Sequence, residues 1–244
     1  MKAFLVMGRT VKAAYDDLFN CVSLSISWWI GALLLPSLFV MAASTINLPF
    51  SIAVSIALLL PLAAAPVTVG VHRVANRIAN YARSDNSLFW EAIPQHIGRG
   101  LILLAICLSV PAVILFYIVV FFNNRSLIMS VFCAWMLLLV LMIGQFLFPL
   151  FWQQDTPDIK LILRNATLLA VRHPLYSFLM LLFQILLLAL CTALVLPLIL
   201  LGPALIALAG NFALAGLLQD MGLAVQPPEI SVVGNNTNYI EPKF

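Results

Sequence analysis

Long apolar runs alternate with short polar segments along this chain, and the runs predict where helices cross a membrane. A helix needs about 20 mostly apolar residues to span the hydrocarbon of a bilayer. Runs of that length cover residues 19–43, 49–71, 101–122 and 127–152. We expect each of these four runs to form one transmembrane helix.

The last apolar stretch, residues 175–218, is about twice as long as one crossing requires. Pro197 and Pro203 interrupt it near its middle. We therefore expect helices over 175–196 and 199–218 joined by a tight turn, either as two full crossings or as a re-entrant hairpin. The pattern predicts an all-α, polytopic membrane helical bundle with six transmembrane helices.

Composition supports lipid as the main solvent of the chain. Hydrophobic residues make up 64% of the sequence and charged residues 9%, whereas a soluble domain is about half apolar and about a quarter charged. We expect one membrane domain over residues 1–223. The polar segment 224–244 contains Pro and Gly and is predicted to be an extended or disordered tail.

The placement of basic residues predicts the orientation. With a cytoplasmic N-terminus, six crossings put Arg125 on the outside and every other Lys and Arg on the inside. Positive charge is retained on the cytoplasmic side of membrane proteins. We therefore expect both termini in the cytoplasm and very short outer loops, at 44–48, 123–126 and 197–203.

Short amphipathic helices are predicted on the cytoplasmic side. Near the N-terminus, Phe4, Met7, Val11 and Tyr15 form an apolar stripe beside two basic residues. A second short helix follows Asn86, and a third follows an N-cap at Thr156. Such helices lie in the headgroup region or pack beneath a bundle. The residues expected to dock partner proteins or contact lipid headgroups are Arg9, Lys12, Arg73, Arg77, Arg164 and Arg172.

An internal repeat is a further hypothesis. Units beginning near Lys2, Asn86 and Thr156 would each hold one amphipathic helix followed by a transmembrane hairpin. Repeats of this kind are common in transporters. The alternative is that successive hairpins resemble one another by accident.

No Asp, Glu, Lys, Arg or His lies near the centre of a predicted span, which argues against a proton relay or a buried carboxylate pair. On the last predicted helix, Ala209, Ala213 and Gly216 form a small-residue face suited to close packing. Amides in lipid need partners on neighbouring helices, or else they line a polar pocket. The amides expected to make intramembrane polar contacts are Gln145, Gln184 and Asn211.

Motifs for catalysis or cofactor binding are missing from the sequence. It contains no phosphate-binding loop, no dinucleotide-binding glycine motif and no metalloprotease or hydrolase signature. His72, His96 and His173 are far apart, and a metal site would need all three segments to converge. We expect no enzyme activity, no cofactor, no metal and no nucleic-acid partner.

Three segments of the chain resemble the YesL-like family of small bacterial membrane proteins of unknown function. They are FLVMGRTVKAAYDDLFNCVSLSISWW, PLAAAPVTVGVHRVANRIA and LILRNATLLAVRHPLYSFLML. The resemblance implies a multi-pass protein of the bacterial plasma membrane. Some members of the family are encoded beside carbohydrate uptake systems, which favours an accessory role there. The resemblance supplies no catalytic residue.

These observations lead to one functional hypothesis and one alternative. The hypothesis is a non-enzymatic accessory or scaffold subunit that acts through membrane lipids and other membrane-protein subunits. The alternative is a small-molecule transporter, or the membrane subunit of one.

Overall fold

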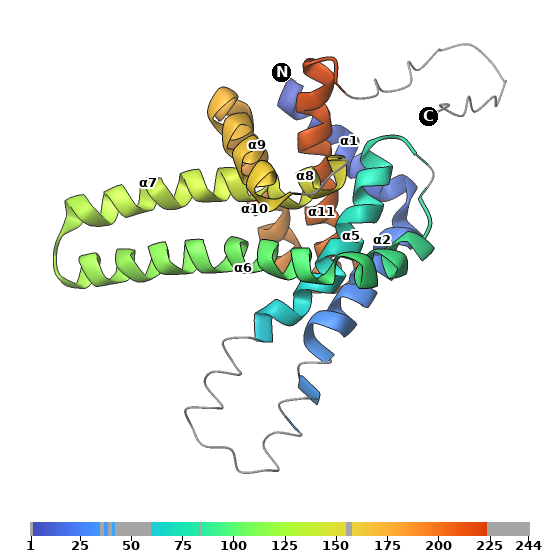
Figure 1. The fold of residues 1–244 in the computed structure, drawn as a ribbon, viewed down its shortest axis with the longest axis horizontal. Coiled ribbons are helices and arrows are strands. Elements are labelled where there is room, and N and C mark those ends of the chain that lie inside the picture. Colours follow the sequence, from blue (N-terminus) through green and yellow to red (C-terminus); the bar gives the residue numbers. More distant parts are fainter. Residues whose placement is uncertain are drawn as a thin grey trace.

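The computed structural model describes residues 2–34, 37–38, 41, 60–82, 84–154 and 158–223, and this part of the chain contains helices and no strand (Figure 1). The prediction of an all-α protein is confirmed for these residues. The elements are α1 (Lys2–Asp16), α2 (Leu18–Trp29), the π-helix η1 (Ile30–Leu34), the 3₁₀-helix η2 (Leu60–Ala64), α5 (Ala65–Ala79), α6 (Ser87–Asn123), α7 (Leu127–Gly144), α8 (Leu147–Gln153), α9 (Ile159–Arg172), α10 (Pro174–Leu194) and α11 (Leu196–Asp220).

Among the residues that the structure describes, four helical segments are long and apolar enough to cross a membrane: α6, α7 together with α8, α10 and α11. They match the predicted spans from residue 101 onward. The predicted spans 19–43 and 49–71 lie partly outside the described residues, as do the loop 44–48 and the tail 224–244. Residues 18–33 form a shorter apolar helix.

Helices α6 and α7 form an antiparallel hairpin that projects from the rest of the molecule (Figure 1). Only 6% of the apolar window of α6 and 11% of that of α7 and α8 is buried inside the protein. Large side chains such as Phe116, Phe122, Ile128 and Trp135 are therefore exposed along the hairpin. Contacts within the described part of the chain do not cover this surface, so its apolar side chains need an apolar medium or further protein around them.

Helix α11 is the centre of the packed part, with 61% of its apolar window buried. It contacts α1, α2, α5, α8 and α10. Ala209 and Ala213 are fully buried, and a Cβ added at Gly216 would lie 2.8 Å from both the Tyr176 hydroxyl and Val6 Cγ2. The predicted small-residue face is confirmed, and within this chain it packs on α10 and α1.

The turn between α10 and α11 lies at Val195, earlier than the predicted turn at 197–203. Pro197 stands in the first turn of α11, where its missing N–H costs no hydrogen bond. Pro203 lies inside α11. The Ala204 N–H near it lies 3.3 Å from Ser25 Oγ on α2, which accepts a hydrogen bond from it.

The short helix expected after Asn86 ends at a kink within α6, two residues beyond Pro94. The backbone leaves helical geometry there, at His96. The helix then continues to Asn123. Phe89 and Ala92, in its first turns, are buried.

The other two amphipathic helices differ in detail from the prediction. Helix α9 starts at Ile159 with Asp158 as its N-cap, whose carboxylate accepts from Lys160 N–H, in place of the predicted cap at Thr156. In α1, Phe4, Val11 and Tyr15 face outward. Smaller residues on the opposite side, Ala3, Val6, Thr10 and Ala14, are buried instead.

Candidate functional site: the junction around α8

The predicted span 127–152 is broken at Gln145 and Phe146, where α7 ends and α8 begins. Pro149 has no N–H, so the carbonyl of Gln145 lacks the usual partner four residues on. Residues 146–151 are buried after the break, so α8 enters the packed part of the molecule instead of continuing α7. The side chains that surround α8 form a cluster that we call the α8 junction: His72, Arg73, Asn76, Asn80, Glu91, His96, Trp152, Gln153 and Asn211.

Hydrogen bonds fasten the end of α8 to α5. The indole N–H of Trp152 donates to the carbonyl of Val69 at 3.0 Å. The side-chain oxygen of Gln153 accepts from the amides of Asn76 and Asn80, each at 3.2 Å. Asn76 and Asn80 are one helical turn apart and therefore reach the same acceptor.

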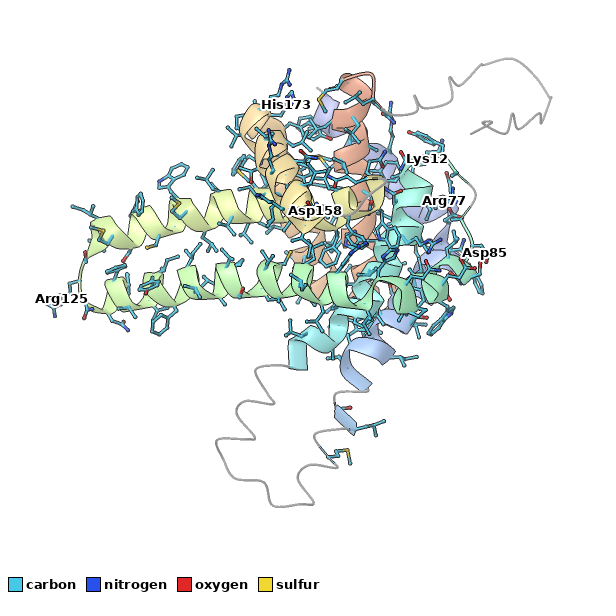
Figure 2. All side chains as sticks on the ribbon, in the orientation of Figure 1. Lys12, Arg77, Asp85, Arg125, Asp158 and His173 are labelled. Carbon is cyan, nitrogen blue, oxygen red and sulfur yellow. The ribbon has the colours of Figure 1, made fainter. Side chains whose placement is uncertain are left out.

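Two histidines lie against the aromatic residues of α8. The ring of His72 stacks on Phe148, with centroids 5.0 Å apart. His96 meets Phe151 and Trp152 edge to face, at 5.3 and 5.0 Å. His173 lies between α9 and α10, away from this cluster (Figure 2). Within the described residues no group of three His, Cys, Asp or Glu side chains could hold a metal ion.

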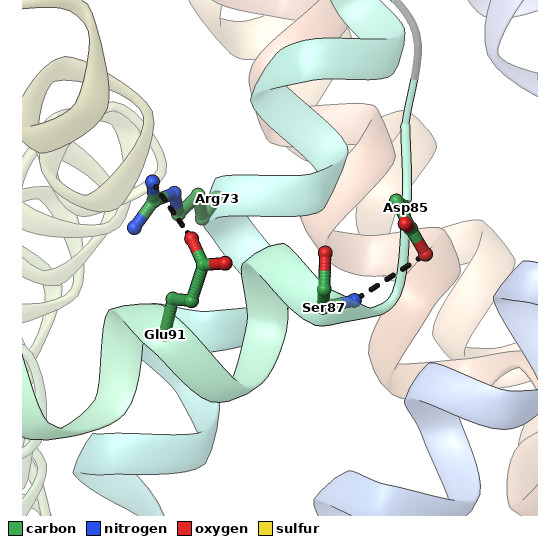
Figure 3. A network of polar contacts seen from close by, with 4 residues as sticks. All are labelled: Arg73, Asp85, Ser87 and Glu91. Carbon is green, nitrogen blue, oxygen red and sulfur yellow. Dashed lines mark hydrogen bonds and ion pairs between the residues drawn. The ribbon is translucent and has the colours of Figure 1, made fainter.

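Arg73 is held inside the junction. Its guanidinium carbon lies 5.3 Å from the centroid of the Trp152 ring. Its Nη2 lies 3.7 Å from Glu91 Oε2 (Figure 3). The arginine side chain is 23% exposed and the glutamate side chain 54%. This ion pair joins α5 to α6 at the rim of the junction, beside the N-terminus of α6.

The amide of Asn211 connects α11 to α5. Its Nδ2 donates to the carbonyl of Ala207 at 2.8 Å and lies 3.1 Å from His72 Nδ1. The imidazole therefore accepts at Nδ1, which requires a neutral ring. His72 lies outside the four candidate spans, and burial lowers its pKa to about 3. Both observations describe an uncharged histidine at neutral pH.

A second polar region lies between the α7–α8 break, α10 and α11. The Gln145 amide donates to the carbonyl of Ser177 at 2.9 Å. The Gln184 amide nitrogen would lie 3.8 Å from a Cβ added at Gly210. Four buried polar atoms here accept or donate no hydrogen bond within the described residues: Gln145 Oε1, Ser177 Oγ, Gln184 Nε2 and Asn211 Oδ1. An unpaired buried polar atom is unfavourable, so this region suits water or a small polar ligand.

The basic residues singled out in the sequence fall into two groups in the structure, exposed ones and ones that contact other side chains. Lys12, Arg77, Arg164 and Arg172 are exposed and have no ion-pair partner among the described residues. Arg9 donates to Gln219 Oε1 at 3.3 Å, and Arg73 belongs to the α8 junction. Figure 2 shows Arg125 at the tip of the α6–α7 hairpin, far from Lys12 and Arg77.

The sequence singled out Gln145 and Asn211, which do contact neighbouring helices, but the polar side of α5 was missed. Asn76, Asn80 and Gln153 lie beyond the predicted span ends, where polar residues are ordinary. The spacing of Asn76 and Asn80 was the one available signal. Their partner Gln153 could be found only with the position of α8 in three dimensions.

The junction can fix the mutual orientation of four helices and present an ion pair at its rim. Comparisons of the chain with protein-family models, with curated proteins and with solved structures give no match. Function is therefore inferred from the geometry of the junction and from the distribution of charge.

Proposed function

We propose that the chain is a non-enzymatic integral protein of the bacterial plasma membrane that acts as an accessory or scaffold subunit for partner proteins. In this proposal six helices cross the bilayer, both termini are cytoplasmic, and the partners belong to a solute uptake system. The observation that carries the proposal is the separation of charge. Lys12, Arg77, Arg164 and Arg172 are exposed on the packed part of the molecule, while Arg125 lies alone at the hairpin tip.

The membrane setting is supported by the α6–α7 hairpin. Its side chains are apolar and outward-facing on nearly every side. Burial of apolar area contributes about 25 cal/mol per Å², so exposing this surface to water would be strongly unfavourable. Lipid around the hairpin would remove that cost, and no second protein would be needed to cover the apolar surface.

Both arms of the hairpin are interrupted at the base, α6 at His96 and α7 at Gln145–Phe146. Figure 1 shows the hairpin directed to the side of α11. If all six helices cross one bilayer, these two interruptions are where the hairpin changes direction relative to α11. Breaks in both arms allow the hairpin to turn as a unit.

The threefold repeat also belongs to the proposal. The described part of the chain has a short helix ahead of apolar helices at three places: α1 before α2, the first turns of α6 before the α6–α7 hairpin, and α9 before α10 and α11. In this arrangement every unit would present one amphipathic helix at the same membrane surface.

Copurification tests the accessory function. The wild-type protein is isolated from its native membrane in mild detergent, and bound proteins are identified and counted by mass spectrometry. A stoichiometric partner is expected. The double variant Lys12→Glu/Arg77→Glu should lose it, while Arg125→Gln should retain it. A monodisperse protein that carries no stoichiometric partner would overturn the proposal.

A second candidate, a small-molecule transporter or its membrane subunit, is favoured by one observation. The break at Gln145 leaves its carbonyl without the usual donor at Pro149, beside buried polar side-chain atoms that have no partner among the described residues. Transporters use broken helices of this kind to bind substrates. Saturable solute uptake by liposomes containing the purified chain, reduced in Gln145→Leu, would support this candidate. Uptake equal to that of empty liposomes would count against it.

A further inference from the structure

The exposed face of α9 combines basic and apolar side chains. We define it as Leu161, Arg164, Leu168, Val171 and Arg172, all of which are exposed. The opposite face, made of Ile162, Ala166 and Ala170, is buried and packs against α7 and α8. The helix thus has an apolar side inside the protein and a second, mixed side outside it.

This mixed face is unusual for a helix in water. Leu168 and Val171 are 56% and 68% exposed. Arg164 lies one turn from Leu168, and Arg172 lies one turn beyond it. A surface with both arginines and large apolar side chains suits the boundary between headgroups and acyl chains, where charge and hydrocarbon are both within reach.

The face continues into a membrane-spanning surface. Helix α9 ends at Arg172, and α10, one of the four candidate spans, begins at Pro174. Leu175 and Leu182 of α10 are exposed and extend the apolar side chains of α9. The end of α9 therefore lies two residues from the start of α10, and so next to whatever medium surrounds α10.

The length of α9 indicates how the helix lies. Its 14 residues measure about 20 Å at 1.5 Å per residue. A helix that rose straight out of the membrane would expose apolar residues only near α10. Leu161, at the far end, is also exposed, so the apolar character persists along the whole helix. This pattern fits a helix that runs along the bilayer surface.

We propose that the exposed face of α9 binds anionic phospholipid headgroups. Arg164 and Arg172 contact lipid phosphates, which the planar guanidinium matches with paired hydrogen bonds. Leu161, Leu168 and Val171 enter the boundary between headgroups and acyl chains. The inference rests on the proposed membrane setting, and it assigns this face of α9 to lipid, leaving Lys12 and Arg77 for partner proteins.

Two features of the exposed face of α9 favour lipid over a protein partner. The face adjoins α10, whose exposed side chains are those of a membrane span. It also holds no acidic residue, so it complements the negative charge of phosphatidylglycerol. A basic residue near an anionic membrane surface contributes about fivefold to binding.

Native mass spectrometry of the purified full-length chain tests the proposal. The protein is exchanged into micelles that contain equal amounts of phosphatidylglycerol and phosphatidylcholine, and retained lipids are counted. The wild type and Arg125→Gln should retain phosphatidylglycerol preferentially. The double variant Arg164→Gln/Arg172→Gln should lose about 25-fold of that preference, two factors of about five.

A second measurement uses the wild type alone, so it does not depend on variant folding. Added phosphatidylglycerol should raise the thermal unfolding midpoint more than phosphatidylcholine does, and molar NaCl should reduce the difference by screening.

Equal retention of both lipids by wild type and double variant would overturn the inference. Loss of a copurifying protein in the double variant would assign the face to a protein partner, which also overturns it. Failure of the proposed function would appear separately, as the absence of a partner that depends on Lys12 and Arg77.

Discussion

The side-chain amide of Asn211 lies 3.1 Å from the ring nitrogen Nδ1 of His72, so a single polar contact links the central helix α11 to α5. The same amide donates to the carbonyl of Ala207 within its own helix. Asn211 is 2% exposed. The contact is therefore made in the interior, where an unpaired ring nitrogen has no water to replace it.

Replacing Asn211 with leucine should destabilise the protein. The substitution removes both donated hydrogen bonds and leaves His72 Nδ1 without a donor, which should cost about 1–2 kcal/mol. Thermal unfolding in detergent measures the loss. Thr192→Val is the matched control, because the Thr192 hydroxyl is exposed and donates only to Leu188 of its own helix. Equal midpoints for Asn211→Leu and wild type would show that the contact contributes nothing.

Acid should weaken the fold through His72. Its folded pKa of about 3 lies below the unfolded value of about 6.5, so the unfolded chain binds the extra proton between these values. Stability contributed by the neutral ring is complete above about pH 6.5 and falls by up to about 1.4 kcal/mol per unit as the pH drops towards 3. Unfolding midpoints measured between pH 7 and pH 4 should fall less in His72→Gln than in wild type. Identical pH profiles would contradict the assignment.

The close contact of α5 with α6 depends on Gly70. A Cβ there would lie 2.6 Å from Phe89 Cδ2 and 2.9 Å from the Phe89 carbonyl oxygen. Because that carbonyl belongs to the backbone, Gly70→Ala should force the two helices apart at a cost of about 1–3 kcal/mol. Gly98→Ala provides the control, since nothing lies within 4 Å of its added Cβ. The unfolding midpoints of the two variants are compared. A lower midpoint for Gly98→Ala than for Gly70→Ala would contradict the prediction.

Charge reversal should distinguish Arg73 from Arg77. Arg73→Glu removes the contact with the Trp152 ring and places two carboxylates together at Glu91, so a loss of about 1–2 kcal/mol is expected. Arg77 is exposed, and Arg77→Glu should change stability by no more than about 0.5 kcal/mol. Unfolding midpoints of the two variants in the same detergent test this order. A larger loss of stability in Arg77→Glu than in Arg73→Glu would contradict the structural role assigned to Arg73.

Hydropathy predicted the helical class and the later apolar helices, because each depends on local composition, but it placed the turn between α10 and α11 later than Val195, the residue at which the structure has it. The break at Gln145 was not predicted. Pro149 marks a weak point in the helix, but the direction of α8 is set by what it packs against. The same limit applies to Arg73, whose partners Glu91 and Trp152 come from two other helices and cannot be identified from spacing along the chain.

The outward stripe of α1 shows a second limit. Phe4, Val11 and Tyr15 were correctly placed on one face, but the choice of inner face follows size as well as polarity. Ala3, Val6 and Ala14 let α1 approach α11 closely, which a stripe of aromatic residues would prevent. The periodicity of a sequence identifies the faces of a helix, while close packing decides which face lies against the rest of the protein.

The orientation of the α6–α7 hairpin across the bilayer is the central claim, and labelling of engineered cysteines in intact cells tests it most directly. Asn124→Cys at the hairpin tip and Ser87→Cys at the start of α6 are each treated with a membrane-impermeant maleimide, with the wild type as the control for its own four cysteines. Asn124→Cys should react in intact cells, and Ser87→Cys only after permeabilisation. Reaction of both positions from the same side of the membrane, or Ser87→Cys alone from the outside, would contradict the account.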